Sequence, residues 1–596
     1  MQPTGELDAC LGSFLSGPLR EPIPSNVHQT HCRTLILILA TVALGLSTRL
    51  YHLDAAGFAE DEAAKIEAVR SYRRGDFTVN SEHPMLLKLL CAASLGASEA
   101  WNKRSRSLPS LWISEETALR LPSVIFGALT VIPLFLLSES LLGYPAALIT
   151  SFLWAAGLNA IWFNRIAKED SVFVFFLLVS YYLYNRAKNL PAQDIRGQER
   201  FYVLSGVAVG LMCSSKYLPH FYGLLALFYY LAGYDGRNNR PLSRRMKTMH
   251  FAAIILTLGV FDFAIGLPGT WRYLWNFVRG NLQVHHGYVV MNRLYPNDMG
   301  ATPAGPPWYL YYLYLLVKMP VPVLAAFVVG LIEIFTWRRR ERTWRGYLFL
   351  RVMLIFWLIP MPLLGAKFLR YTLTLMPFVY MTAAVGTIVI WRLLLNAASR
   401  GWDRRRSLLS AAISDAREPN SFGNGRISKW WPNGGYGFAN LSSVAVVMAV
   451  FVIWPAIAGI RSLPYPSLYT NLLGGGRADY FFPHDEFYDV GARESIRYIA
   501  EHAAAGARVA TDIPGVLKIY LERYGRPDIR SEIISRPRSD LLSSPPDYVL
   551  FQPGRIYYEN QDYLRMLRNN LVPVQVSCFR NSVAAEVFDL RGLEQE

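Results

Sequence analysis

The chain has 596 residues, of which 52% are hydrophobic and 17% are charged, and its formal net charge is +16. A soluble protein of this length carries nearer a quarter charged residues, so the composition argues against a soluble enzyme and predicts a membrane protein. Much of the basic excess lies in short loops between apolar runs, which is typical of membrane topology and argues against nucleic-acid binding.

The chain begins with some thirty residues ahead of the first apolar run, so we interpret that run as an uncleaved helix and not as a signal peptide. Runs of about 18 to 25 apolar residues are long enough to cross a bilayer as helices. About eleven such spans are expected, at residues 34–53, 120–141, 145–162, 170–187, 202–218, 219–234, 248–267, 308–336, 346–364, 371–394 and 439–460. The eighth is interrupted by Pro320 and Pro322, and we expect its first part to lie at the membrane interface.

The basic residues predict the orientation of these spans. With residues 1–33 as a cytoplasmic tail, the Arg- and Lys-rich loops near residues 186–200, 237–247, 338–345 and 400–429 all face the cytoplasm, as the positive-inside rule requires. We therefore predict an integral protein of a bacterial-type inner or plasma membrane. Residues 396–437, rich in Gly, Ser, Arg and Asn, are expected to be a basic cytoplasmic linker before the last span, 438–460.

Three segments then face outward, at 54–119, 268–307 and 461–596. The last alternates helix-like stretches (491–504, 515–524, 561–570) with strand-like ones (508–513, 547–551, 572–578, 584–590), which predicts a small extracytoplasmic α/β domain. Within it, His484, Asp485 and Glu486 are adjacent, so their side chains point apart. This favours a solvated turn over a metal site.

Ionisable residues cluster at the outward ends of the spans, where burial near lipid is costly. In chain order the candidates are Asp61, Glu62, Glu82, His83, Lys88, Arg165, Asp170, Lys216, His285, His286, Lys367, Arg370 and Tyr371. The first loop supplies carboxylates and the later helix ends supply cations. A carboxylate can take the proton from an attacking hydroxyl, and cations can stabilise a departing phosphate. The pattern predicts sugar transfer from a lipid phosphate.

These residues also carry a family resemblance over about residues 34–395. The pair Asp61-Glu62 after the first span, the segment His83-Pro84-Met85-Leu86-Leu87-Lys88, Arg120 at the start of the next helix, the turn from Arg165 to Asp170, and Lys367-x-x-Arg370-Tyr371 follow in order. In this the chain resembles the membrane glycosyltransferases of family 39, which include protein O-mannosyltransferases and aminoarabinose transferases. Met85 stands where the mannosyltransferases have a second proline, so a protein acceptor is less strongly indicated.

The resemblance implies the C-type glycosyltransferase fold over residues 34–395 and an inverting, single-displacement reaction without an obligatory cofactor. It implies that Asp61 is the catalytic base, with Glu62 orienting it or contacting the acceptor. Arg165, Lys367, Arg370 and Tyr371 then face the donor phosphate. The residues leave a divalent metal requirement open.

The expected partners are a polyprenyl-phosphate-linked sugar, membrane lipids, and an acceptor that is a protein, a lipid or a glycan. Two other classes of function remain open. A transporter or flippase for the same lipid-linked sugar would show internal repeats, and we find none. A transporter would also leave Asp61-Glu62 without a role. The other class is a catalytically inactive scaffold whose C-terminal tail recruits partners.

Overall fold

The structure is a computed structural model. It describes residues 25–233, 242–279, 282–283, 287–299, 305–336, 343–415, 445–536, 541 and 544–591. The predictions for residues 1–24, for His285 and His286, and for residues 416–437 of the linker lie outside these ranges.

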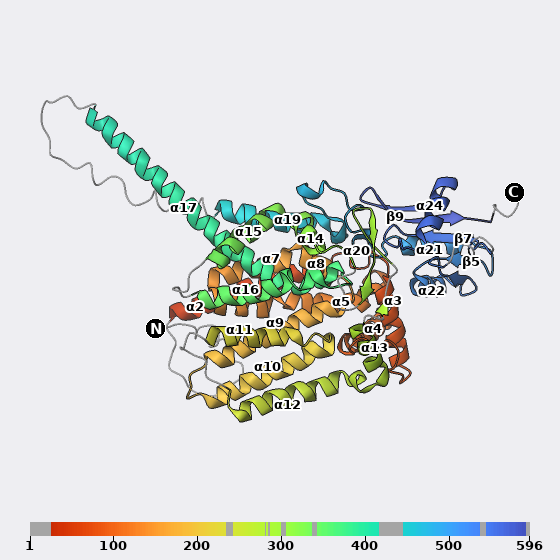
Figure 1. The fold of residues 1–596 in the computed structure, drawn as a ribbon, viewed down its shortest axis with the longest axis horizontal. Coiled ribbons are helices and arrows are strands. Elements are labelled where there is room, and N and C mark those ends of the chain that lie inside the picture. The colour runs from red at the N-terminus through yellow and green to blue at the C-terminus, as the bar shows by residue number, and fades with distance from the viewer. Residues whose placement is uncertain are drawn as a thin grey trace.

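The described chain is mostly helical, and Figure 1 shows the long helices side by side in a bundle, with α17 extending from it at the end opposite the C-terminal sheet. The helices of this part of the chain, long and short, are α2 (Ser25–Leu50), α5 (Glu115–Leu129), α6 (Val131–Leu142), α7 (Tyr144–Ala156), α8 (Leu158–Asn164), α9 (Glu169–Asn189), α10 (Ile195–Ser215), α11 (His220–Gly233), α12 (Arg244–Phe261), α14 (Leu310–Lys318), α15 (Val321–Thr336), α16 (Trp344–Leu358), α17 (Met376–Asp415) and α19 (Trp454–Ser462).

Five helices in the described ranges are long and apolar enough to cross a membrane, which supports an integral membrane protein. They are Cys32–Leu50, Pro109–Leu142, Trp344–Leu363, Met376–Ala397 and Ala445–Ser462, and the bent pair α7 and α8 adds a sixth if it forms one span. The expected number of eleven is therefore not confirmed. Helices occupy the other predicted spans, but some are short: α11 has 14 residues and α15 has 16, where a bilayer needs about 20.

One predicted boundary coincides with a break between helices, and another falls inside a helix. The eighth predicted span does break at its prolines, into α14 and α15, because proline cannot continue the hydrogen bonding of a helix. The linker predicted from residue 396 instead begins as helix, since α17 continues to Asp415. Residues 396–415 contain four Ala and four Arg, which are strong helix formers, and these outweigh the Gly and the four Ser in the same stretch.

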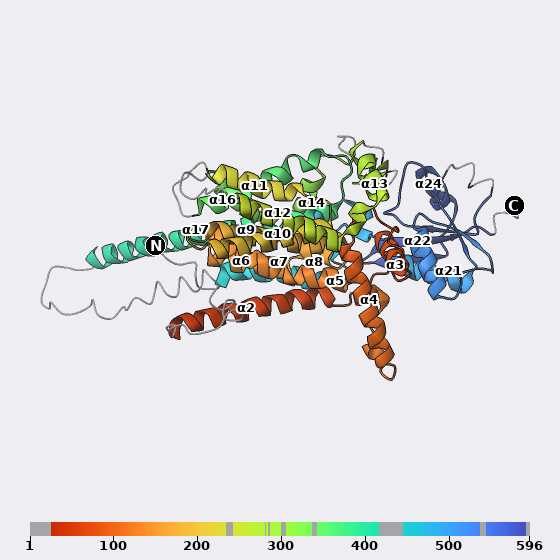
Figure 2. The same ribbon diagram turned by 90° about the horizontal axis from the view of Figure 1, so that it is seen from below.

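The loop after the first span, predicted to face outward, folds into α3 (Glu60–Tyr72) and α4 (Leu86–Arg104), and Figure 2 shows α4 projecting from the body of the molecule. Ala59 is the N-cap residue of α3, and its backbone N–H donates to the Glu62 carboxylate at 3.1 Å. Glu60, Asp61 and Glu62 fill the first turn, where negative charge is favoured by the helix dipole. The second loop holds α13 (Pro268–Val278) and the short strands β1 (Leu282–Gln283), β2 (Tyr288–Val290), β3 (Arg293–Tyr295) and β4 (Asp298–Met299).

The C-terminal region contains a five-stranded mixed sheet in the order β6-β5-β7-β9-β8. β5 (Arg508–Ala510) runs parallel to β6 (Arg530–Glu532) and to β7 (Tyr548–Phe551), whereas β9 (Ser582–Asp589) runs antiparallel to β7 and to β8 (Gln575–Phe579). The accompanying helices are α20 (Pro483–Phe487), α21 (Ala492–His502), α22 (Pro514–Arg523) and α24 (Gln561–Asn570). β6 was not expected, because it is a three-residue edge strand with charged ends.

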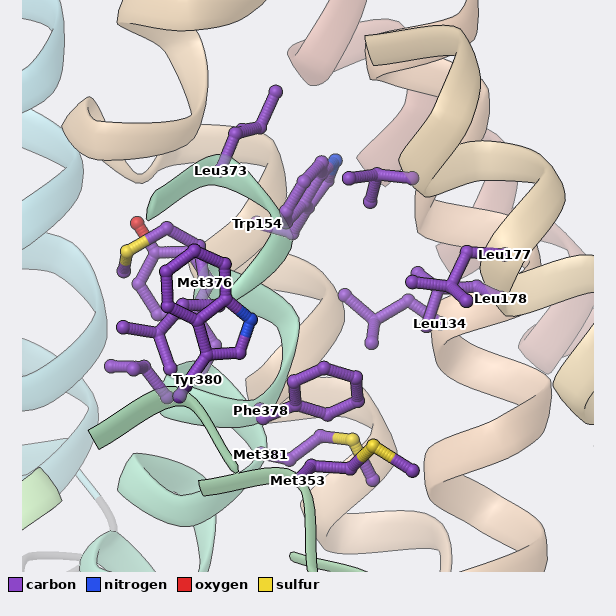
Figure 3. Close-up of a cluster of buried hydrophobic side chains, with 14 of the residues drawn as sticks. Leu134, Trp154, Leu177, Leu178, Met353, Leu373, Met376, Phe378, Tyr380 and Met381 are labelled. Carbon is purple, nitrogen blue, oxygen red and sulfur yellow. The ribbon is translucent and has the colours of Figure 1, made fainter. Parts of the chain in front are cut away.

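The core of the bundle lies between α6, α7, α9, α16 and α17, as Figure 3 shows for Leu134, Trp154, Leu177, Phe378 and Tyr380. The indole of Trp154 donates to the carbonyl of Gly127 at 2.7 Å, so its one polar atom is satisfied inside the core. These contacts fix the helices whose ends carry the polar site.

Candidate active site

Asp61 lies at the centre of a cluster of polar side chains drawn from four parts of the chain. Its Oδ2 atom lies 2.7 Å from Nζ of Lys168 and 3.4 Å from a guanidinium nitrogen of Arg370, and it accepts a hydrogen bond of 2.7 Å from the Tyr488 hydroxyl. The side chain is 32% exposed. All three of these contacts reach Oδ2.

The two cations that contact Asp61 stand just before helices α9 and α17. Lys168 is the last residue before α9, and Arg370 belongs to η4 (Leu369–Thr374), the turn that precedes α17. The guanidinium of Arg370 packs 4.3 Å from the centre of the Phe368 ring and 5.6 Å from that of Tyr371. Both cations are largely buried, so their charges are poorly screened by water.

A third cation lies on the Tyr371 side of this cluster. Nζ of Lys216 lies 4.6 Å from the centre of the Tyr371 ring and 2.6 Å from Oδ1 of Asp170. Lys168, Arg370 and Lys216 therefore face only two carboxylates, Asp61 and Asp170, in their direct contacts.

Glu62, the neighbour of Asp61, has a different environment. Its carboxylate is completely buried and receives two hydrogen bonds from the Arg120 guanidinium, at 2.8 and 2.6 Å. It also accepts from the backbone N–H groups of Ala59 and Ala167, at 3.1 and 2.9 Å. These four bonds join α3, α5 and the turn before α9. The geometry therefore favours a role for Glu62 in holding the site together over contact with the acceptor.

A buried ion pair and a histidine lie near these charged groups. Lys65 and Glu169 form an ion pair of 2.9 Å with both side chains almost fully buried. His83 packs against the ring of Tyr273, and burial lowers its pKa to about 3 although the nearby Glu169 opposes this. The imidazole is therefore neutral and can act as a hydrogen-bond partner but not as a charge.

The charges around Asp61 determine its protonation. Burial alone raises the pKa of Asp61, but Lys168, Arg370 and Lys65 together outweigh it and hold the pKa well below its usual value. Burial lowers the pKa of Lys168 to about 8, with Asp61 opposing this shift and Arg370 and Lys65 adding to it. At neutral pH the centre is thus a carboxylate among ammonium and guanidinium groups.

Several predicted site residues bond to the backbone instead. Arg165 donates to the carbonyls of Arg49, Tyr51 and His52, each at 2.8 Å, and so caps the end of α2. Lys367 is buried and donates to the carbonyl of Pro306 at 2.7 Å. These arrangements favour structural roles for both and leave their predicted contact with a phosphate as a prediction.

Two more of the predicted residues, one before α4 and one in its first turn, bond to the segment that leads into α4. Lys88 donates to the carbonyls of Asn80 and His83, the latter at 2.9 Å, and Glu82 accepts from the Asn80 side chain at 2.7 Å. These bonds shape the turn that carries His83. Tyr371, Asp170 and Lys216 do join the Asp61 cluster, as described above.

The expectation of a solvated turn at His484, Asp485 and Glu486 is wrong. All three are buried in α20, with exposed fractions of 6%, 2% and 0%. Asp485 accepts from the Tyr288 hydroxyl and from the backbone N–H of Leu369, and Glu486 forms an ion pair of 2.5 Å with Lys318. Their partners lie far away in sequence, so local spacing could not reveal them.

Sequence reasoning also did not place Lys168, Arg120 or Tyr488 in the site. Arg120 and Lys168 both stand within the quoted motifs, so a signal for them existed. No signal in the sequence pointed to Tyr488, because it follows a short helix in the distant C-terminal region. In the part of the chain that the structure describes, no group of three or more His, Cys, Asp or Glu side chains is placed to hold a metal ion.

Comparison with known proteins supports the resemblance to family 39. Residues 108–261 match a family model described as dolichyl-phosphate-mannose-protein mannosyltransferase. This segment contains Arg120, Lys168, Asp170 and Lys216 but not Asp61 or the turn around Arg370. No curated protein sequence matches the chain.

Solved structures of membrane glycosyltransferases are similar to the chain at low identity. ArnT from Cupriavidus metallidurans in the apo state shares 13% identity, covering 93% of this chain and 98% of that one, with a TM-score of 0.48. The Archaeoglobus fulgidus oligosaccharyltransferase shares 11%, covering 87% and 69%, with a TM-score of 0.46. The S. cerevisiae Pmt1-Pmt2 complex shares 18%, covering 48% and 40%, with a TM-score of 0.31. At TM-scores this low, no residue of those proteins is matched to a residue here.

Proposed function

We propose that the chain transfers a monosaccharide from a polyprenyl-phosphate donor to an acceptor hydroxyl on the extracytoplasmic side of the membrane, with inversion at the anomeric carbon. The observation that carries the proposal is a partly exposed carboxylate, Asp61, bound on one oxygen by Lys168 and Arg370. The match of residues 108–261 to a family that uses a dolichyl-phosphate sugar supports it.

The cations of the cluster suit this donor. A polyprenyl-phosphate sugar is a phosphodiester with one negative charge, and Lys168 and Arg370 lie, largely buried, beside the partly exposed Asp61 carboxylate. One cation about 4 Å from a phosphate contributes on the order of 4 kcal/mol at an effective dielectric near 20. The guanidinium of Arg370 adds a planar fork that matches two phosphate oxygens.

The reaction uses the two sides of this cluster together. The acceptor oxygen forms a bond to the anomeric carbon, its proton passes to Oδ1 of Asp61, and the bond between that carbon and the phosphate oxygen breaks. Polyprenyl phosphate leaves with the bonding electrons, and the cations stabilise the charge that develops on it. When the donor phosphate binds Lys168 and Arg370, these cations stabilise the Asp61 carboxylate less. The pKa of Asp61 therefore rises, and Asp61 is a stronger base in the donor complex.

The acceptor decides between the finer versions of this function. A protein serine or threonine would make the activity protein O-mannosylation, whereas a lipid A-like or other glycan hydroxyl would make it lipid or glycan modification. Met85 weakens the first version, as the sequence indicates. A transporter of the same lipid-linked sugar leaves the Asp61 cluster without a reaction to serve.

The test uses the full-length protein in detergent with a panel of radiolabelled polyprenyl-phosphate sugars. Wild type should release the label from one of these lipids into an added acceptor, and Asp61→Asn should lower the rate by about 10² to 10⁴ while donor binding persists. Asp54→Asn, which removes another carboxylate of the same loop, is the matched control. Label release by Asp61→Asn at the wild-type rate would overturn the mechanism, and label that crosses a vesicle bilayer while still on its lipid would show a transporter.

A further inference from the structure

The segment that brings Tyr488 to Asp61 has an unusual backbone. Tyr488 and Asp489 both have positive φ, of 44° and 63°, directly after α20. Left-handed conformations are uncommon for residues other than glycine, and a bulky tyrosine adopts one only where its surroundings impose it. The two consecutive residues therefore point to a constraint at this position.

Arg555 supplies that constraint from another part of the C-terminal region. Its guanidinium donates two hydrogen bonds to the Asp489 carboxylate, at 2.9 and 2.6 Å, and a third to the Glu60 carboxylate at 2.6 Å. The backbone N–H of Glu60 donates to Asp489 at 2.9 Å. Arg555 and Asp489 are buried, so the bonds between them are shielded from water, whereas the Glu60 side chain is 43% exposed.

The network brackets the contact with Asp61. Glu60 directly precedes Asp61, and Asp489 directly follows Tyr488. Arg555 therefore holds together two short segments whose next residues share the 2.7 Å hydrogen bond between the Tyr488 hydroxyl and Asp61. Because the one guanidinium bonds to both segments, it restrains the distance between the Tyr488 hydroxyl and Asp61.

We propose that Tyr488, held by the Asp489–Arg555–Glu60 network, is a positioning residue for the base Asp61, so that the C-terminal region is part of the active site. This inference rests on the proposed function. The Tyr488 hydroxyl, together with Lys168 and Arg370, occupies Oδ2 and turns Oδ1 toward the acceptor. A hydrogen bond to the charged carboxylate also stabilises that charged form.

Tyr520 provides a matched control within the same region. Its hydroxyl accepts from the backbone N–H of Phe58 and donates to the Glu116 carboxylate, both at 2.8 Å. Like Tyr488, it is a tyrosine that joins the C-terminal region to a carboxylate of the first outward loop or the start of α5, but it does not contact Asp61. Figure 2 shows α22, which carries Tyr520, beside α3.

The experiment compares Tyr488→Phe, Tyr520→Phe and Asp61→Asn in full-length protein, with the radiolabelled polyprenyl-phosphate sugar that wild type uses. Tyr488→Phe should lower kcat about tenfold with the donor KM unchanged. It should also move the acid limb of the kcat profile to higher pH, because Asp61 loses a donor that favours its charged form. Tyr520→Phe should leave the acid limb in place.

A second variant keeps the test decisive if Tyr488→Phe folds poorly. Arg555→Lys keeps the charge but loses the fork, and it should shift the acid limb in the same direction without altering the tyrosine. An unmoved acid limb in both Tyr488→Phe and Arg555→Lys, or an equal shift in Tyr520→Phe, would overturn the inference while Asp61→Asn still loses activity. Full activity in Asp61→Asn would instead overturn the proposed function itself.

Discussion

The Arg120 guanidinium and the Glu62 carboxylate form a two-bond ion pair in which the Glu62 side chain is completely buried. Its neighbour Asp61 is 32% exposed and bonds through one oxygen. Two consecutive carboxylates in one helical turn therefore have opposite surroundings. We expect them to respond in opposite ways to removal of their charge.

Glu62→Gln should destabilise the protein, because it leaves the Arg120 guanidinium buried without its counter-charge. Breaking a buried pair in this way costs about 3 to 5 kcal/mol. The melting temperature in detergent should fall clearly for Glu62→Gln and little for Asp61→Asn. A Glu62→Gln protein with the wild-type melting temperature and no transfer activity would contradict this assignment and return Glu62 to the reaction.

Arg370 and Lys367 share one motif, but only Arg370 reaches the Asp61 cluster. Arg370→Ala should reduce kcat/KM for the donor by roughly 10²-fold, near 3 kcal/mol, as loss of a donor to a developing charge does. Arg370→Lys should lose less, because charge remains without the fork. Lys367→Gln should lower stability with little change in donor kinetics, since its partner is the Pro306 carbonyl. Equal kinetic losses in both positions would contradict the distinction.

The pKa of Lys168 predicts an alkaline limit to activity. Because burial lowers this pKa to about 8, the ammonium that faces Asp61 and the donor is present below that pH and is lost above it. The value of kcat/KM for the donor should therefore fall as the pH rises through about 8. In Lys168→Arg the guanidinium stays charged, so the limb should move to higher pH. A limb that stays at the same pH in Lys168→Arg must belong to another group.

The native cysteines test the predicted orientation. Cys578 is exposed in β8 of the C-terminal region, and Cys32 is exposed at the beginning of the first span. A membrane-impermeant thiol reagent applied to intact cells should label Cys578, and Cys578→Ser should remove that label. Cys32 should react only after the cells are opened. Labelling in the reverse order would place the Asp61 cluster on the cytoplasmic side.

The sequence revealed the features that depend on local pattern and motif. Apolar runs indicated helices, proline marked the break between α14 and α15, and the order of motifs brought forward Asp61 and Arg370. It did not separate residues that bond to the backbone from residues that face a substrate. Arg165 and Arg370 look alike in sequence as outward arginines. Only the fold shows that one caps α2 and the other contacts a carboxylate.

The spacing of residues in the sequence could not predict contacts between distant segments. Adjacent side chains on a turn do point apart, which is why His484, Asp485 and Glu486 were expected in water. In the structure, His484 and Asp485 both contact Tyr288, and Glu486 pairs with Lys318. A polar residue is buried when a partner from elsewhere satisfies it, and the identity of that partner is not written in the surrounding sequence.

The contact between Asp61 and Tyr488 joins residues 427 positions apart, and that between Glu60 and Arg555 spans 495. Ribosomes release a chain from its N-terminus, so Asp61 is in the membrane long before Tyr488 and Arg555 have been made. A nascent chain thus holds its cations and its carboxylate without the Tyr488 hydroxyl that bonds to that carboxylate. On the inference that Tyr488 positions Asp61, the centre therefore reaches its full rate only when translation has supplied the C-terminal region.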